Sequence, residues 1–433
     1  MAQRVSASAP RPIYARRCRK AASAAAAVVA GAVLAGCAEP DPIPTLSWYI
    51  NPDNGTQARL AAKCTQEAGG RYRIRTALLP RDSTAQREQL VRRLAARDSS
   101  VDIMSLDVPY LAEFANAGFI RRFSADERTR LTRGMLDAPL ASASWDDGLY
   151  GVPFNANTQL LWARKSVAER AGLDLDRRLT WDEVIDAAER TGTTVLVQAR
   201  RYEGYAVLIN SLVASAGGAI LENADAGKDA VPAIDSAAGR AAARVIARLA
   251  HSSAASAALG NSDEGVTQSA FRAANAGFMT NWPFVYTAED GNPLQADFGW
   301  SRWPAVEPDV PSAPPLGGIH LAIGAFSAHE DFAVEAVACL TSPESQREYM
   351  LGEGLLATIE SVYDDPEIRR AFPMADLLRE SLDEAAPRPI TPYYPDVTAV
   401  IQRTWHPPAA VNDETPARTA RMIADVLHDR TLL

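Results

Sequence analysis

The stretch "LSWYINPDNGTQARLAAKCTQEAGG", residues 46–70, decides the fold class of this chain. Its first five residues favour a β-strand, and residues 51–55 combine the Asn, Pro, Asp and Gly that are typical of a turn. The residues that follow place Leu60, Cys64 and Ala68 on one face of a helix, which Gly69 and Gly70 end. A strand followed directly by an amphipathic helix is the unit from which α/β proteins are built.

The same unit then recurs twice. "YRIRTALL" (72–79) alternates like a half-buried strand, and "AQREQLVRRLAA" (85–96) has helical spacing. "VDIMSLD" (101–107) is a compact buried strand, and "YLAEFANAG" (110–118) is a helix. This βαβαβα order predicts a parallel sheet covered by helices.

A second α/β set begins near residue 158. Capping boxes are expected where Thr180 precedes Glu183 and where Ser327 precedes Glu330. The expected helices are 179–192, 204–218, 239–250, 266–277 and 327–340, and the expected strands are 194–199, 278–281 and 319–326. No repeat of fixed period occurs, so we expect two distinct α/β lobes.

The N-terminus has the features of an export signal. Six basic residues precede an uncharged Ala- and Val-rich run at 21–35, which is shorter than the roughly 20 residues of a bilayer span. The run ends in "LAGC" (34–37), which resembles a bacterial lipobox and predicts a lipid on Cys37; an ordinary secretory signal with an incidental cysteine is the alternative. Arg16 and Arg17 leave the Sec and twin-arginine export routes both open. The proline-rich residues 37–44 predict a tether.

The remaining cysteines are Cys64 and Cys339, because Cys18 lies in the signal segment. Both fall on the apolar faces of expected helices, and two cysteines in an oxidising compartment favour a disulfide. Two buried free thiols are the alternative. A bridge would join segments far apart in the sequence, so the chain would cross between lobes more than once. Such crossings predict a hinge and a ligand cleft between the lobes.

The charge of the chain excludes some partners. The formal net charge is −9, and removal of residues 1–36 takes away six basic residues and no acidic ones, which leaves about −15. A chain this acidic is not expected to bind nucleic acid or anionic lipid.

Polar residues at three expected strand ends predict a sugar site. Asn54 follows the first strand, Asp107 ends the third, and Asn281 with Trp282 ends the strand 278–281. Ligands of open α/β sheets collect at such ends, and amides, acids and an indole plate suit a sugar's hydroxyls and C–H face. The alternatives are a core role for Trp282 and a helix N-cap for Asp107.

Catalytic and metal signatures are poor. The chain has no HExxH, CxxC, GxSxG or P-loop motif, and neither a cofactor nor a metal is expected. Asp107 with Glu264 is the one carboxylate pair that we name for a secreted glycoside hydrolase. Glu264 also begins a helix, where the helix dipole favours an acid in any case. We therefore expect a binding protein rather than an enzyme.

Several stretches together resemble the extracytoplasmic solute-binding lipoproteins of ABC sugar importers, and most closely the actinobacterial trehalose-binding lipoproteins of the LpqY family. The resemblance covers roughly residues 46–400, and the order of the stretches is more specific than any one of them. They are "LPRDSTAQREQLVRRL", "LDVPYLAEFANAGF", "NTQLLW", "SAGG", "NWPFV", "LGGIHLA", "GEGLLA" and "RPITPYY".

The resemblance implies a ligand site and its residues. The positions that match the family's pocket are Asp107, Asn157, Glu264, Asn281, Trp282 and Arg388, followed by Asn54, Gly317 and Gly318. The implied ligand is trehalose or a closely related α-linked disaccharide, and a maltose-like sugar or a glycerophosphodiester is the alternative cargo. The segment between Val285 and Leu316 is shorter than is usual in the family, which bears on the choice of sugar.

The resemblance also implies an architecture and partners. The fold would be a two-lobe, type II, cluster-D-like periplasmic-binding-protein fold, with lobe 1 at 45–157 and 282–345 and lobe 2 at 158–281 and 346–433. The protein would be a monomer, anchored through Cys37 to the outer face of the cytoplasmic membrane. It would deliver its sugar to permease subunits that work with a cytoplasmic ATPase.

Overall fold

The computed structural model describes residues 43–431, which form one compact unit. The predicted signal segment 1–36, the predicted lipidation site Cys37 and most of the predicted tether 37–44 lie outside the described residues.

The first sheet confirms the predicted βαβαβα arrangement. Its strand order is β2-β1-β3-β13-β6, and β1 pairs in parallel with both β2 and β3. β13 enters from a later part of the chain and runs antiparallel to β3 and β6, so the sheet is mixed rather than wholly parallel. The strands are β1 (Thr45–Ile50), β2 (Arg73–Leu78), β3 (Ile103–Asp107), β6 (Val152–Asn157) and β13 (Gly317–Ile323).

The alternation of side chains along these strands builds a core on each face of the first sheet. In β1, Trp48 belongs to one hydrophobic cluster and its neighbour Tyr49 to another. In β3, Ile103 and Met104 divide in the same way. Successive side chains of a strand point to opposite faces, so a strand covered on both sides is apolar throughout.

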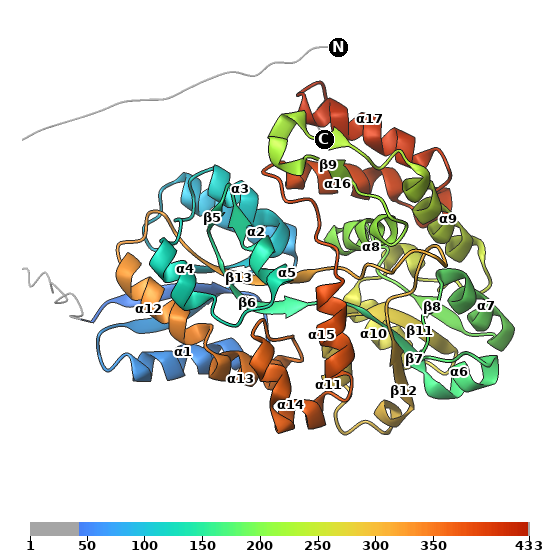
Figure 1. Cartoon of the computed structure of the whole chain (residues 1–433), viewed down its shortest axis with the longest axis horizontal. Helices are drawn as coiled ribbons and strands as arrows, with labels where there is room; N and C mark the ends of the chain where they lie inside the picture. The colour runs from blue at the N-terminus through green and yellow to red at the C-terminus, as the bar shows by residue number, and fades with distance from the viewer. Residues whose placement is uncertain (1–42, 432–433) are drawn as a thin grey trace, which may run out of the picture. The chain divides into compact units, whose positions relative to one another are not determined.

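Helices cover both faces of this sheet and complete lobe 1, which lies on the left in Figure 1. They are α1 (Thr56–Glu67), α2 (Ser83–Ala95), α3 (Leu111–Asn116), α4 (Ala125–Leu131), α5 (Asp137–Ser142), α12 (Glu330–Leu340), α13 (Pro343–Glu353), α14 (Pro366–Ala371) and α15 (Ala375–Asp383). A short 3-10 turn, η1 (Val108–Tyr110), follows β3, and a two-stranded ribbon is formed by β4 (Ser144–Trp145) and β5 (Gly148–Leu149).

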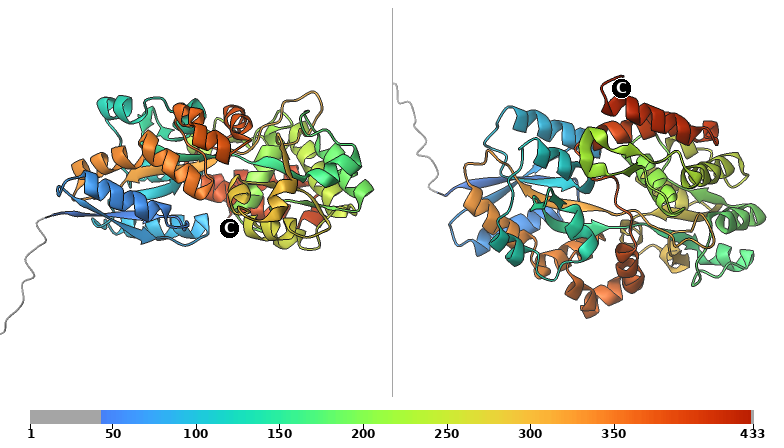
Figure 2. Two further views of the ribbon diagram at one scale, coloured as in Figure 1. Left: turned by 90° about the horizontal axis from the view of Figure 1, so that it is seen from below. Right: turned by 45° about the horizontal axis from the view of Figure 1, so that its top comes forward.

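Lobe 2 is built on the second sheet, whose order is β12-β7-β11-β8. Its strands are β7 (Leu160–Arg164), β8 (Thr194–Leu196), β11 (Ala276–Asn281) and β12 (Phe298–Ser301). Its helices are α6 (Lys165–Ala171), α7 (Trp181–Thr191), α8 (Glu203–Ala214), α9 (Ala237–His251), α10 (Glu264–Phe271), α11 (Phe284–Thr287), α16 (Tyr394–Trp405) and α17 (Thr415–Leu427). A ribbon of β9 (Leu221–Glu222) and β10 (Val231–Pro232) is added, and Figure 2 shows α16 and α17 packed on this lobe.

The predicted lobe boundaries differ from the structure in two places. β12 lies inside the segment 282–345 that was expected in lobe 1, yet it pairs with β7 in the second sheet. α14 and α15 lie inside the segment 346–433 that was expected in lobe 2, yet α14 packs on α13 and α15 packs on α5, both in lobe 1. α13 packs on α1 and crosses the predicted boundary at residue 346. Both differences follow from strand and helix partners that the local sequence does not specify.

One of the two predicted capping boxes is confirmed. Thr180 and Glu183 cap α7 reciprocally. The box expected at Ser327 is wrong, because α12 begins at Glu330 with His329 as its uncapped N-cap. The Ser327 hydroxyl instead donates to the buried Asp102 at 2.6 Å, so a tertiary partner takes the place of the helix cap.

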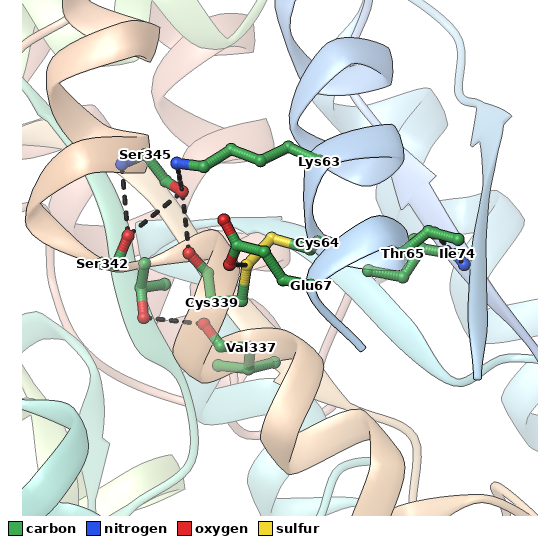
Figure 3. Close-up of a disulfide and its surroundings, with 10 residues drawn as sticks. Lys63, Cys64, Thr65, Glu67, Ile74, Val337, Cys339, Ser342 and Ser345 are labelled. Carbon is green, nitrogen blue, oxygen red and sulfur yellow. Dashed lines mark hydrogen bonds between the residues drawn. A yellow bond between two sulfur atoms is a disulfide. The ribbon is translucent and has the colours of Figure 1, made fainter. Parts of the chain in front are cut away.

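The structure contains the predicted disulfide between Cys64 and Cys339. Its Cα atoms lie 5.9 Å apart, and the two cysteines are separated by 275 positions in the sequence. Figure 3 shows the bridge joining α1 to α12, with Lys63 and Ser345 on the neighbouring turns. The bridge therefore fastens an early and a late segment together within lobe 1.

His320, in the middle of β13, makes the stability of lobe 1 depend on pH. The ring is fully buried, and its Nε2 lies 3.0 Å from Ser142 Oγ. Burial lowers the pKa of His320 from 6.5 to about 3, so the ring is neutral in the folded protein at neutral pH. The unfolded chain gains a proton below pH 6.5 that the folded protein does not accept. This contribution to stability is therefore complete above pH 6.5 and is lost as the pH falls toward 3.

Substitution His320→Gln is expected to remove this dependence on pH. Between pH 7 and pH 5 the native protein should lose about 2 kcal/mol more of its unfolding free energy than the variant does. Urea unfolding at the two pH values measures this difference, because the other titrating groups are common to both proteins. Equal losses in the two proteins would contradict the burial of a neutral His320.

Candidate functional site

The ends of neighbouring strands bring predicted site residues together in lobe 1. β3 ends at Asp107 and β6 ends at Asn157. β13 begins at Gly317 between these strands, and its register pairs Gly317 with Asn157 and Ile319 with Asp107. Asp107 and Asn157 therefore flank the first residues of β13 at one edge of the sheet.

The two glycines that open β13 are required by close packing. A Cβ on Gly317 would lie 3.0 Å from Trp282 Cη2 and 3.5 Å from Asn157 Cβ. Gly318 has a φ of +135°, and a Cβ there would lie 2.4 Å from the Asn155 carbonyl oxygen. Gly317 thus lets the indole approach the strand, whereas the fit against β6 explains Gly318 without reference to a sugar.

Arg388 joins two carboxylates from different parts of the fold. Its Nη2 donates to Asp107 Oδ1 at 2.9 Å, and its Nη1 donates to Glu203 Oε1 at 2.6 Å. Only 5% of the Arg388 side chain and 6% of the Glu203 side chain are exposed. Burial alone would lower the pKa of Arg388, but Asp107, Tyr394 and Glu203 raise it well above its ordinary value, so the guanidinium stays charged.

Asn281 holds the backbone at Trp282 through its side-chain amide. The residue is fully buried at the end of β11, and its Nδ2 donates to the Glu264 carbonyl at 3.1 Å and to Thr267 Oγ1 at 3.0 Å. Its Oδ1 accepts the backbone N–H of Trp282 at 2.8 Å. Protein groups therefore already use both ends of the amide, and the direct sugar contact expected of Asn281 stays a prediction.

Trp282 brings the two sheets together at the site. It directly follows β11 of the second sheet, and its ring packs on Gly317 of the first. Burial raises the pKa of the Glu264 carboxyl, while the Tyr202 hydroxyl and the Trp282 indole, which face the carboxylate, oppose this rise. Glu264 is the first residue of α10, and Tyr202 directly precedes α8.

These contacts form a continuous set around the junction of the two sheets, because Tyr202 and Glu203 are consecutive residues that lie beside Glu264 and Arg388 respectively, and Asp107 and Asn157 flank the first residues of β13. Every predicted site residue except Asn54 and Gly318 belongs to it or directly supports it. We call this group the contact ring, and its members are Asp107, Gly317, Asn157, Trp282, Glu264, Tyr202, Glu203 and Arg388.

Three buried polar atoms of the contact ring are available for hydrogen bonds to a ligand. Asn157 Oδ1 and Arg388 Nε are buried and have no hydrogen-bond partner among residues 43–431, and the buried Tyr202 Oη faces the Glu264 carboxyl without a bond of full hydrogen-bond geometry. Atoms of this kind occur elsewhere, as at His320 Nδ1, but the ring gathers three of them. Buried polar groups are normally paired, so an acceptor, a hydroxyl and a cationic donor in one ring indicate a polar ligand.

Asn54 takes part in a different contact. Its backbone N–H and its Nδ2 donate to the Glu353 carboxylate at 3.0 Å and 3.1 Å. Thr56, at the start of α1, donates to the same carboxylate. Asn54 therefore fastens the start of α1 to the end of α13, and none of these contacts reaches the contact ring.

No metal site accompanies the contact ring within the described part of the chain. The one group of possible metal ligands among these residues is Cys64, Glu67 and Cys339, and its two cysteines form the disulfide. Two open hollows of about 570 Å³ each lie elsewhere on the surface. One is lined by Arg122 and Glu330 among others and the second by Tyr286 and Trp300 among others, and no residue of the contact ring lines either.

The two-lobe α/β fold, with an aromatic ring and unpaired hydrogen-bonding groups where its two sheets meet, defines the class of solute-binding proteins. Comparison with known proteins gives the family: the model of the bacterial extracellular solute-binding proteins matches residues 59–374, more than half of the chain. The chain belongs to that family.

A curated relative agrees with this assignment, and two solved structures agree with the fold. A "Probable ABC transporter-binding protein" of Deinococcus radiodurans is 25% identical over 342 residues, which are 73% of this chain and 76% of the relative. The maltose-bound MalE3 of T. maritima is similar in structure, with a TM-score of 0.79 and 24% identity, over 89% of this chain and 100% of that one. The GacH receptor of Streptomyces glaucescens, studied with acarbose, has a TM-score of 0.77 and 21% identity over 89% and 100%.

The family assignment places the protein outside the cytoplasm. Within residues 43–431, none of the helices has both the length and the apolar character that a membrane span requires.

Proposed function

We propose that this protein captures a neutral α-linked disaccharide, trehalose or a close relative, outside the cytoplasmic membrane and delivers it unaltered to an ABC permease. The lipid on Cys37 would hold the protein at the membrane, and a cytoplasmic ATPase would drive uptake. The name of the Deinococcus radiodurans relative supports a role in an ABC transporter.

The contact ring is the observation that carries this proposal. Trp282 offers an indole face on which a sugar ring stacks, and Asp107 and Arg388 offer charge-assisted hydrogen bonds to its hydroxyls. Asn157 adds an unpaired acceptor beside them. Because Trp282 extends from the second sheet and Asp107 ends a strand of the first, a bound sugar would stabilise the state in which the lobes are together.

The charge of the contact ring favours a neutral cargo over a glycerophosphodiester. Asp107, Glu203 and Glu264 supply three carboxyl groups, and Arg388 is the one basic residue of the ring. A phosphodiester would bring a further negative charge into this group, at a Coulombic cost that burial increases. A maltose-like sugar is neutral and stays the second candidate, since the MalE3 structure contains maltose.

A thermal-shift panel tests the proposal. The mature chain is heated with trehalose, maltose, other disaccharides, glucose and glycerophosphocholine, and a ligand that binds only the folded state raises the melting temperature. We expect an α-linked disaccharide to give the largest rise. Prolonged incubation followed by a glucose assay tests the hydrolase alternative, which requires release of glucose from the disaccharide by Asp107 and Glu264. A panel without any shift from a disaccharide would reject the proposal.

Substitution Tyr202→Phe is expected to weaken disaccharide binding about threefold to tenfold, the loss of one hydrogen bond of about 1 kcal/mol. The hydroxyl has no protein partner that meets strict hydrogen-bond geometry, so its removal should change the melting temperature of the ligand-free protein little. Calorimetric titration measures the affinity. Tyr205→Phe serves as the control, because the Tyr205 hydroxyl donates to the Trp405 carbonyl in the core of lobe 2. An unchanged affinity in Tyr202→Phe would remove Tyr202 from the ligand site.

A further inference from the structure

Glu203 is a buried acid whose two carboxylate oxygens are both used. Oε1 accepts hydrogen bonds from Arg388 Nη1 and from the Tyr394 hydroxyl, and Oε2 accepts from Thr398 Oγ1 at 2.6 Å. Tyr394 and Thr398 lie one turn apart on α16, so this helix fixes the carboxylate from one side. Gln402, one turn further, donates to Thr398 Oγ1 at 3.1 Å and extends the support.

Arg388 itself has little local support. It lies in the coil between α15 and α16, outside any helix or strand. Its guanidinium donates to Asp107 and Glu203, and its Nε is unpaired among the described residues. Two carboxylates on two different Nη atoms fix both the position and the plane of a guanidinium group. The direction in which Nε points is therefore set by these two acids together.

The two acids come from different lobes. Asp107 ends β3 of the first sheet, whereas Glu203 begins α8, whose buried side chains belong to the lobe 2 core. Tyr394 reinforces the junction, because its ring meets Tyr110 of η1 at 5.8 Å between centroids. Arg388 thus lies where the lobes meet, and Glu203 is its lobe 2 partner.

We propose that Glu203 is the positioning residue of the ligand site: it holds Arg388 across the lobe junction so that the guanidinium keeps the orientation in which its unpaired Nε meets a ligand oxygen. Glu203 itself does not touch the ligand. This inference rests on the proposed function, and it assigns a role to Glu203 that was not expected from the sequence.

We attribute the burial of Glu203 to the orientation that it gives Arg388 rather than to a gain in the stability of the folded protein. Moving an ion pair out of water costs desolvation free energy, and the attraction between the two charges offsets this cost only when further hydrogen bonds satisfy both groups. Proteins in which apolar residues replace a buried ion pair are often equally stable. The carboxylate of Glu203 has that complete set of partners. The advantage of the acid over an apolar residue is then the fixed direction of Arg388.

The test compares Glu203→Gln with two control variants of the mature chain. Glu203→Gln keeps the size of the side chain but removes the charge that attracts Arg388. Thr398→Val removes a hydrogen bond from Oε2 and leaves the contact between Oε1 and Arg388 in place. Glu222→Gln removes a charge from the exposed strand β9. Calorimetric titration with the best disaccharide of the thermal-shift panel gives both the affinity and the fraction of protein that binds.

We expect Glu203→Gln to weaken binding at least tenfold with a normal binding fraction. Thr398→Val, which keeps the contact between Oε1 and Arg388, should lose clearly less affinity, and Glu222→Gln should change the affinity less than threefold. A purely structural role would lower the binding fraction and the melting temperature and leave the affinity of the folded protein unchanged. That result would overturn the proposal. Equal losses in Glu203→Gln and Thr398→Val would also overturn it, because the loss would then not depend on the contact with Arg388.

A second measurement needs no sugar and separates this inference from the proposed function. In nitrogen-15 NMR of the ligand-free protein, a guanidinium held on both Nη atoms rotates slowly and gives separate Nη signals, which Arg388→Lys identifies by their loss. We expect Glu203→Gln to merge these signals and Thr398→Val to keep them. Signals that stay separate in Glu203→Gln would reject the positioning role even if the protein binds sugar. If Glu203→Gln does not fold, Glu203→Asp, which withdraws the charge by one methylene, is read in the same way.

Discussion

Replacing Trp282 by alanine is expected to weaken disaccharide binding at least tenfold, because the variant loses the aromatic face on which a sugar ring would stack. The indole lies against Gly317 where the two sheets meet, and burial of an aromatic side chain against a ligand contributes a few kcal/mol. The buried Asn281 side chain accepts the backbone N–H of Trp282, so the indole is held in place before a ligand binds. Calorimetric titration of the mature chain measures the loss.

Trp300→Ala is the matched control for this substitution. Trp300 is a second partly buried indole, on β12, where it meets Tyr286 edge to face at 5.9 Å and takes no part in the contact ring. Both variants lose comparable area, but only Trp282→Ala should lose affinity, and the melting temperatures of the two ligand-free variants should be similar. An unchanged affinity in Trp282→Ala would assign the indole to the core instead.

Removing the disulfide is expected to have the largest effect on stability. The bridge closes a loop of 275 positions, and the chain-entropy model gives a stabilisation of about 5.6 kcal/mol for a loop of this length. The double variant Cys64→Ala, Cys339→Ala should therefore unfold at a clearly lower denaturant concentration than the native protein. Its sugar affinity should be unchanged, because the bridge joins α1 to α12 and makes no contact with the contact ring.

Reduction provides the control for the disulfide. A thiol reductant should shift the unfolding midpoint of the native protein toward that of the double variant and leave the double variant where it is. If the reductant shifts both proteins equally, or if the double variant is as stable as the native protein, the bridge does not contribute the stability that its loop length implies.

The parts of the fold that could be predicted from the sequence are those that depend on residues close together in the chain. The β-strand expected at 46–50 and the helix that places Leu60 and Cys64 on one buried face are both confirmed in the structure, because each depends on residues that are close together in the sequence. Ser327 shows the limit of this reasoning: its local pattern is that of a helix cap, yet it donates to Asp102, which is 225 positions away. A partner so distant in the sequence leaves no local pattern.

The same limit applies to the candidate site. Asp107 and Trp282 stand at strand ends, which are readable from the sequence, and the structure brings both into the contact ring. Glu203 was missed because its partner Arg388 is 185 positions away, and an acid at the start of a helix looks like an ordinary response to the helix dipole. Asn54 was assigned to the site from its place in a turn, but its partner is Glu353, 299 positions away.

A crystal structure of the mature chain with the disaccharide that gives the largest thermal shift would test the central claim most directly. We expect one sugar ring to lie against the Trp282 indole, and hydroxyl groups to lie within hydrogen-bond distance of Asp107, Asn157 and the Arg388 guanidinium. A sugar bound at another place, with Trp282 and Arg388 making no contact to it, would contradict the proposal that the contact ring is the site of capture.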